Sequence, residues 1–163
     1  MAAPQRYSVV VSKDYLKFAA AHFIAYKGFR EALHGHNYRM SVEVEGALGE
    51  QGYVLDFGVV KEIARGPCKR LNEKVLLPAH SDCLEIRERD GQCVVRYEDD
   101  EFSFPKKDVF LVPIVHSSAE ELARYLVGEL RAALRAEGIE KLQAIQVGVE
   151  ETPGQAAYYR EDE

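Results

Sequence analysis

The stretch LHGHNYRM, residues 33–40, contains two histidines separated by one glycine. Because successive side chains of a β-strand point to opposite faces, His34 and His36 would share one face. The chain has only five histidines, and two of them on one face at the mouth of a strand suit a metal ion better than a core. A zinc site with an open position uses three protein ligands and leaves the fourth for water or substrate.

The third ligand should come from the same face of a neighbouring strand, and His22 is the candidate. It lies at the end of the first expected strand, and the loop 24–33 returns the chain to His34. Of the other histidines, His80 lies in a loop and His116 precedes a helix. A lone histidine is most often a surface or capped residue, so the metal hypothesis depends on the three-histidine spacing.

The strands that would hold these ligands follow from alternation of apolar and polar residues. Residues 6–23 and 36–46 each alternate, which predicts two long strands joined by the loop 24–33. Asp56 is the expected N-cap of a helix from about 58 to 72, and Gly66-Pro67 should kink or break that helix.

The second half of the chain completes an α+β pattern. We expect a hairpin over residues 84–104 that turns at Asp90-Gly91, then a short strand over 109–112. A helix begins at Ser117 or Ser118 and ends at Gly138. Two closing strands are joined by residues 152–154. The prediction is a single domain, residues 1–163, with an antiparallel sheet.

Composition excludes several classes of protein. The 163 residues are 47% apolar and 29% charged with a net charge of −6, which is typical of a soluble globular domain. Lys and Arg form no stripe and no apolar run reaches membrane length, so we expect neither nucleic acid nor membrane as a partner. The N-terminus MAAPQRYSVVV does not resemble a signal peptide. Three cysteines without a C-x-x-C pair favour a reducing compartment, and we expect a cytoplasmic protein.

The run AAAHFIAYKGFREALHGHNYRMSVEVEG resembles the 6-pyruvoyl-tetrahydropterin synthase / 6-carboxy-tetrahydropterin synthase family. The resemblance extends through YVLDFGVVKEI, LNEKVLLP, SSAEELARYL and VGVEETPG, and omits only the segment near 84–108. It implies the tunnelling fold, a four-stranded antiparallel sheet with two helices on one face, here with a hairpin insertion. It also implies a homohexamer of two stacked trimers and zinc on His22, His34 and His36.

The implied reaction starts from 7,8-dihydroneopterin triphosphate, a small-molecule pterin. Zinc would lower the pKa of the side-chain hydroxyls while a base removes protons and triphosphate is eliminated. The dihydropterin ring would relay the electrons, so no redox cofactor is required.

The chain departs from the family at the base. The usual cysteine before the HGH element is absent, and Glu31 stands three residues before His34. This resembles a variant branch that cleaves the side chain to give 6-hydroxymethyl-7,8-dihydropterin. A carboxylate can act as a general base, and the alternative is a solvated loop residue. The family's Asp-His pair is replaced by Asn72 and Glu73, so Glu73, His80 or His116 would have to be the second acid or base.

The family's pterin anchor is retained. Glu151 and Thr152 match its E-T-x motif, in which the carboxylate faces two N–H donors of the pterin. Glu150 is the alternative, and strand alternation turns only one of the two inward. Ser118 matches a threonine near the pterin, although an N-cap paired with Glu121 explains it as well.

These residues predict a zinc-dependent lyase of the pterin synthase family. A side-chain-cleaving enzyme is the rival within enzymes. A pterin- or zinc-binding protein without turnover is the rival outside them, because the usual cysteine and Asp-His pair are missing.

Overall fold

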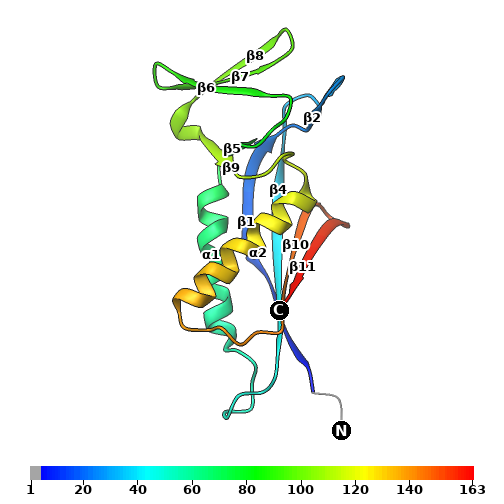
Figure 1. The fold of residues 1–163 in the computed structure, drawn as a ribbon, viewed down its shortest axis with the longest axis vertical. Coiled ribbons are helices and arrows are strands. Elements are labelled where there is room, and N and C mark those ends of the chain that lie inside the picture. The colour runs from blue at the N-terminus through cyan, green and yellow to red at the C-terminus, as the bar shows by residue number, and fades with distance from the viewer. Residues whose placement is uncertain (1–4) are drawn as a thin grey trace.

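A computed structural model describes residues 5–163, so residues 1–4 of the predicted domain lie outside it. Its centre is a six-stranded sheet in the order β11-β10-β4-β1-β5-β9. Two long helices run across one face of this sheet, and a three-stranded sheet caps one end of the molecule (Figure 1).

The two longest strands carry the three predicted metal ligands. β1 (Tyr7–His22) and β4 (His34–Gly46) pair antiparallel, with His22 directly opposite His34. Even-numbered residues of β4 from Tyr38 onward are buried against the helices, whereas the odd-numbered residues face the other side. The predicted alternation is therefore confirmed, and it fixes the side of the sheet on which the histidines lie.

The predicted four-stranded antiparallel sheet is wrong in size and in direction. β5 (Lys74–Pro78) runs parallel to β1, and β9 (Val109–Val112) runs parallel to β5, which makes the sheet mixed. Residues 74–78 were not expected to form a strand at all. Both segments are short apolar runs without alternation, and such runs do not reveal by themselves which strand they join.

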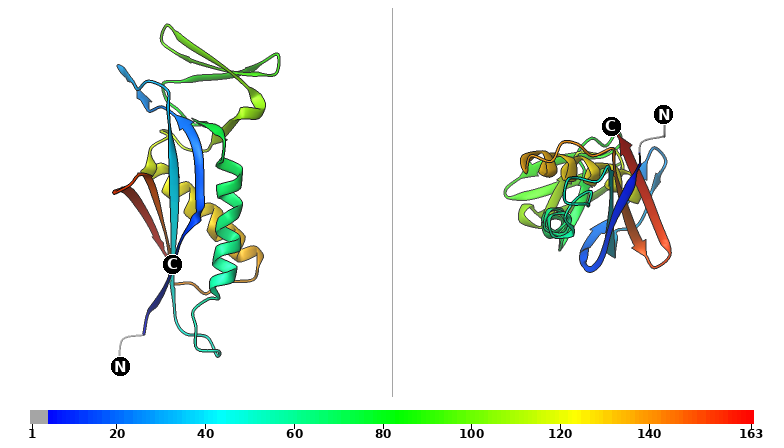
Figure 2. Two further views of the ribbon diagram at one scale, coloured as in Figure 1. Left: turned by 180° about the vertical axis from the view of Figure 1, so that it is seen from behind. Right: turned by 90° about the horizontal axis from the view of Figure 1, so that it is seen from below.

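Both helices cover the same face (Figure 2). α1 (Phe57–Leu71) begins at Asp56, whose side chain accepts a hydrogen bond from the backbone N–H of Gly58 at 2.6 Å, as predicted. Pro67 lies inside α1, and the helix continues past it to Leu71 instead of breaking. α2 (Ala119–Ala136) begins at the N-cap Ser118 and is followed by Gly138 at a φ of 76°. The buried face of α2 contains Leu122, Leu126, Leu130 and Leu134.

The segment outside the resemblance forms a three-stranded antiparallel sheet, here called the insertion sheet. Its strands are β6 (Glu85–Arg89), β7 (Gln92–Tyr97) and β8 (Asp100–Pro105). The predicted turn at Asp90-Gly91 is confirmed, and both residues have positive φ. A short 3-10 helix, Lys106–Asp108, leads from it to β9. The insertion therefore serves as the crossover between the parallel strands β5 and β9.

The insertion sheet packs over a small hydrophobic cluster of its own. Phe23, Leu77, Val95 and Tyr97 belong to that cluster. Phe23 directly follows His22 in the chain. The segment predicted as the loop 24–33 contains a short hairpin, β2 (Ala25–Tyr26) paired with β3 (Phe29–Arg30). The insertion thus rests on the residues that follow the first histidine.

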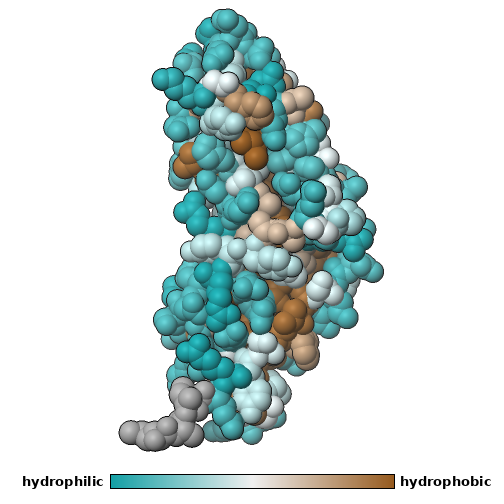
Figure 3. Space-filling model, turned by 90° about the vertical axis from the view of Figure 1, so that its right-hand side faces the viewer, coloured by the Kyte–Doolittle hydropathy of each residue, from teal (hydrophilic) through white to brown (hydrophobic). Residues whose placement is uncertain are grey.

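The two closing strands form one edge of the main sheet. β10 (Ala144–Thr152) pairs with β4, and β11 (Gln155–Asp162) pairs with β10, as the sequence predicted for this last hairpin. The adjoining surface is mainly hydrophilic with apolar patches between the polar side chains (Figure 3). No helix within residues 5–163 has the length and apolar character needed to cross a membrane.

Candidate metal centre and active site

His22, His34 and His36 lie together at the ends of β1 and β4. One nitrogen from each ring lies within 4.8 Å of the others. The ring centroids are 4.6 Å apart for His22 and His34, and 4.9 Å apart for His34 and His36. The geometry follows from register, because His22 pairs with His34 while His36 is two residues further along the same face.

Two of these rings are held by backbone carbonyls. Nδ1 of His22 donates to the carbonyl oxygen of Ser117 at 2.7 Å, and Nδ1 of His34 donates to that of Ala32 at 2.8 Å. Each bond fixes the tautomer in which Nε2 carries a free lone pair. Backbone partners of this kind are typical behind metal-binding histidines.

The residues fit a metal ion on structural grounds. Nε2 of His22 is buried and has no hydrogen-bond partner among the described residues. A buried polar atom without a partner costs free energy, and coordination would satisfy it. Burial also lowers the pKa of His22 below its ordinary value of 6.5, which favours the neutral ring that binds metals.

Glu31 is anchored close to this cluster. Its Oε2 accepts a hydrogen bond from the backbone N–H of Ile24 at 2.9 Å, and its own N–H donates to the carbonyl of Ile24 at 2.9 Å. Ile24 is two residues after His22, so both bonds tie Glu31 to the metal-binding end of β1. The side chain is half-buried and not the solvated loop residue of the alternative interpretation.

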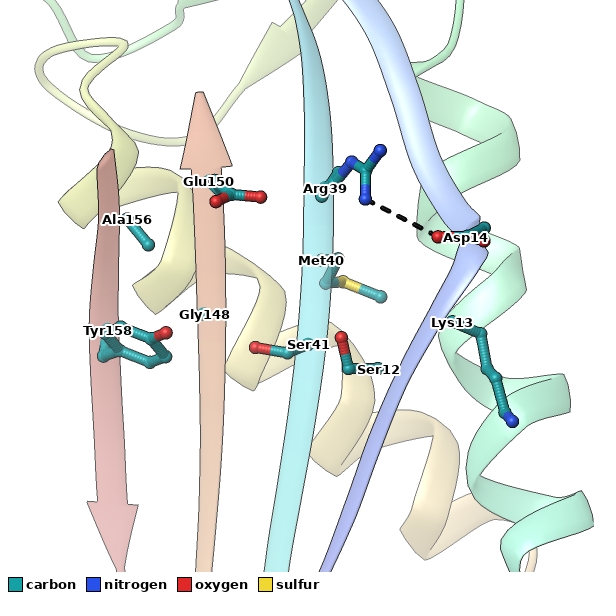
Figure 4. Close-up of a pocket in the computed structure, with 10 residues that line it drawn as sticks. All are labelled: Ser12, Lys13, Asp14, Arg39, Met40, Ser41, Gly148, Glu150, Ala156 and Tyr158. Carbon is teal, nitrogen blue, oxygen red and sulfur yellow. Dashed lines mark ion pairs between the residues drawn. The ribbon is translucent and has the colours of Figure 1, made fainter. Parts of the chain in front are cut away.

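Strand alternation separates the two adjacent glutamates of β10. Glu151 lies on the histidine face, where its Oε1 is 3.9 Å from Nε2 of His22. Glu150 lies on the opposite face, in a hollow beside Arg39 and Tyr158 (Figure 4). There it accepts a hydrogen bond from the backbone N–H of Gly154 at 2.9 Å. Only Glu151 is therefore placed to act together with the histidines.

Tyr38 is a residue of the site that the sequence analysis missed. Its ring centroid lies 5.3 Å from that of His36 and 5.9 Å from that of His22. Burial raises its pKa above the ordinary value, and the nearby carboxylates of Glu151 and Glu31 raise it further. Its hydroxyl is buried without a hydrogen-bond partner in the described chain. Its position two residues after His36 was the available signal.

None of the remaining predicted residues belongs to the three-histidine group. Glu73 has a φ of 58° and lines a shallow hollow to which His36 and Asn37 also contribute. Thr152 ends β10, and its hydroxyl bonds to Gln155. His80 is exposed, and His116 donates to the carbonyl of Ala25 at 3.2 Å, outside the three-histidine group.

Ser118 acts as a helix cap in this structure. Its hydroxyl accepts a hydrogen bond from the backbone N–H of Glu121 at 3.3 Å. The reciprocal half of the expected capping box is absent, because the carboxylate of Glu121 accepts from the N–H of Val115 instead. The cap places Ser117, whose carbonyl holds His22, at the start of α2.

The fold and the site define a class of protein before any comparison is made. It is an α+β protein with a three-histidine group that could hold a metal ion at one end of its two central strands, with the carboxylate of Glu151 beside His22 and that of Glu31 bonded to Ile24.

Comparison with known proteins identifies the family. The model of the family described as 6-pyruvoyl tetrahydropterin synthase matches residues 11–162. The chain belongs to this family.

Two relatives match over most of the chain. A structure of Plasmodium vivax 6-pyruvoyltetrahydropterin synthase, named as a mutant in which a catalytic glutamate is replaced by alanine, has a TM-score of 0.93. It is 38% identical to this chain, with 98% of this chain and 99% of that one covered. A Methanocaldococcus jannaschii protein named as a candidate 6-carboxy-5,6,7,8-tetrahydropterin synthase is 34% identical, covering 89% of this chain and 90% of its own.

A third relative matches over a shorter region. A dihydroneopterin monophosphate aldolase of Pyrococcus furiosus is 39% identical over 59 residues, which are 36% of this chain and 50% of that protein. The relatives are thus named for different reactions of pterin synthesis.

Proposed function

We propose that this protein is a zinc-dependent lyase that acts on 7,8-dihydroneopterin triphosphate and eliminates triphosphate. The observation that carries the proposal is the convergence of three histidines with Glu31 and Glu151 at one end of the sheet. The family assignment supports the pterin chemistry, and the three-nitrogen donor set is typical of catalytic zinc.

Each group has a distinct role in this proposal. His22, His34 and His36 hold zinc, which when bound would favour loss of a proton from the side-chain hydroxyls. Glu31 accepts a proton from the substrate side chain as general base. For elimination this proton comes from the carbon next to the terminal one, and its electron pair forms a carbon–carbon double bond as the bond between the terminal carbon and the triphosphate oxygen breaks and triphosphate leaves.

The pterin ring is held at its N–H edge by Glu151. A carboxylate facing two parallel N–H donors makes two charge-assisted hydrogen bonds. Glu151 lies on the histidine face of β10 and is about a quarter exposed, so it can meet a ligand that enters from solvent. Thr152 and Ser118 flank this edge, and Glu73 is the proposed second acid or base.

A second function is favoured by Glu31 in particular. Cleavage between the first two side-chain carbons would give 6-hydroxymethyl-7,8-dihydropterin, with the first carbon gaining a proton and the second becoming an aldehyde. The Plasmodium vivax relative has a catalytic glutamate by its name, and the Pyrococcus furiosus relative is named an aldolase. Whether Glu31 removes a carbon-bound or an oxygen-bound proton would decide between elimination and cleavage.

One incubation distinguishes these functions. The zinc-loaded protein is mixed with 7,8-dihydroneopterin triphosphate, and the released phosphates and pterin products are identified by mass. The proposal expects free triphosphate with a 6-pyruvoyl or 6-carboxy product. A 6-hydroxymethyl product with the triphosphate still on a two-carbon aldehyde supports the second function. Absence of any product, with zinc and pterin bound, would identify a binding protein and overturn both.

We further propose a homohexamer in the cytoplasm. All three cysteines are free thiols in the structure, which is consistent with a reducing compartment.

A further inference from the structure

The insertion sheet contacts the loop that carries Glu31. Nε and Nη2 of Arg30 both donate to Oδ2 of Asp100, at 3.0 and 2.6 Å, across 70 residues of sequence. The guanidinium of Arg30 also lies over the ring of Phe102, 5.0 Å from its centroid. The loop and the insertion sheet lie at the same end of the molecule (Figures 1 and 2).

Arg30 also bonds to the backbone of Glu31. Its Nη1 donates to the carbonyl oxygen of Glu31 at 2.8 Å. Glu31 is bonded in turn to Ile24 through its own N–H and its carboxylate. One guanidinium therefore connects Asp100 of the insertion sheet to Glu31, whose carboxylate is bonded to Ile24 two residues after the end of β1.

Two further contacts hold the same loop. The hydroxyl of Tyr97 on β7 donates to the carbonyl of Tyr26 at 3.0 Å. The rings of Phe23 and Phe102 are stacked with centroids 5.0 Å apart. The insertion sheet thus contacts both strands of the short hairpin, β2 through Tyr26 and β3 through Arg30.

We propose that the insertion sheet positions the catalytic carboxylate, with Asp100 and Arg30 as positioning residues. The inference deepens the proposed function, because it takes Glu31 as the base. The Asp100 side chain is more than half exposed, and such ion pairs contribute little to folding stability. The ion pair therefore acts on the geometry of Glu31, for which a displacement of about 1 Å can cost about 10²-fold in rate.

The first test separates positioning from folding. Asp100→Ala should lower kcat by about 10- to 100-fold, while KM and bound metal stay within about twofold of the original protein. Asp99→Ala, which removes the exposed carboxylate next in the chain, is the matched control and should leave kcat unchanged. Asp100→Glu restores a carboxylate and should recover most of the lost rate. An unchanged kcat in Asp100→Ala overturns the inference.

The second test needs no turnover. Hydrogen exchange of the Ile24 and Glu31 amides reports directly whether Glu31 stays bonded to Ile24. Both amides should exchange at least about tenfold faster in Asp100→Ala than in Asp99→Ala, while the amides of β4 keep their rates. Equal exchange in the two variants overturns the inference, as does a uniform increase across β4, which would indicate general destabilisation.

The two readouts also separate this inference from the proposed function. If the original protein converts no pterin, the exchange experiment still decides whether Asp100 holds the loop. If Glu31→Gln keeps full turnover while Asp100→Ala frees the Glu31 amide, the role of Glu31 as base fails and the contact between insertion and loop stands.

Discussion

The imidazole of His22 donates a hydrogen bond from Nδ1 to the carbonyl oxygen of Ser117, 95 residues further along the chain. This bond joins the end of β1 to the residue before the N-cap of α2 and leaves Nε2 free. A further bond from the Ser117 hydroxyl to the carbonyl of Phe23, at 2.9 Å, locks the same junction. The orientation of the first proposed ligand thus depends on where α2 begins.

Removal of one histidine should empty the metal site without unfolding the protein. We expect one zinc per chain, with Zn–N distances of about 2.0–2.1 Å by X-ray absorption. His34→Ala should reduce the zinc content to a small fraction, because only two ligands remain. His80→Ala, at an exposed histidine outside the group, should retain zinc. Full zinc occupancy in His34→Ala, measured by elemental analysis, would show that the assignment is wrong.

Glu31→Gln should lower turnover by about 10²–10⁴-fold, the usual contribution of a positioned acid or base. Zinc and pterin binding should be retained, because the amide oxygen of glutamine can still accept from the N–H of Ile24. Steady-state kinetics with parallel zinc analysis measures both. Glu140→Gln, at an exposed glutamate, is the control. If Glu73→Gln loses more activity than Glu31→Gln, Glu73 is the better candidate for the base.

Glu151→Gln and its neighbour Glu150→Gln form a matched pair on opposite faces of β10. Glu151→Gln should weaken pterin binding by about 10- to 100-fold, because one charge-assisted hydrogen bond is worth about 1.5–3 kcal/mol. Glu150→Gln should bind pterin within about twofold of the original protein, because Glu150 lies in the hollow beside Arg39 and Tyr158 on the opposite face of the sheet. Titration calorimetry with a pterin that lacks the phosphorylated side chain, and so cannot react, measures both. Equal losses would remove Glu151 as the anchor.

The exposed edges of the main sheet predict assembly of several chains. β11 and β9 are the two edge strands, and each carries a large exposed apolar side chain, Tyr158 and Leu111. Open edges are usually paired or covered. We expect sedimentation to give six times the monomer mass, and Leu111→Lys to shift the protein towards smaller species. A stable monomer at micromolar concentration would contradict the hexamer.

Acid should weaken the fold through one ion pair on the sheet. Nη1 and Nη2 of Arg160 donate to the carboxylate of Glu45 at 2.7 and 2.6 Å, and these bonds lower the pKa of Glu45 below 4.5. A carboxyl with a lowered folded pKa stabilises the protein above its unfolded pKa, and this stabilisation is lost as pH falls through the folded value.

The melting temperature should therefore separate the original protein from Glu45→Gln in a pH-dependent way. The original protein should melt higher at pH 7, and the difference should shrink as pH is lowered below about 4. Glu140→Gln should follow the original protein at every pH. A difference that stays constant from pH 7 to pH 3 would exclude the Glu45 ionisation as its cause.

The sequence by itself determined the local geometry of the site. Alternation along β4 placed His34 and His36 on one face, and the same rule separated Glu150 from Glu151. The N-cap Asp56 and the turn at Asp90-Gly91 were predictable from the residue types that helix starts and tight turns require. Each of these features depends on residues within a few positions of one another, where backbone geometry leaves few choices.

Only the tertiary structure decided which distant segments meet. The strands β5 and β9 join the sheet in parallel because of what they pack against, and their short apolar sequences contain no such information. The contact between Asp100 and Arg30 and the bond between Ser117 and His22 span 70 and 95 residues. Such contacts form only when the whole chain closes, because their partners are chosen by packing and not by spacing.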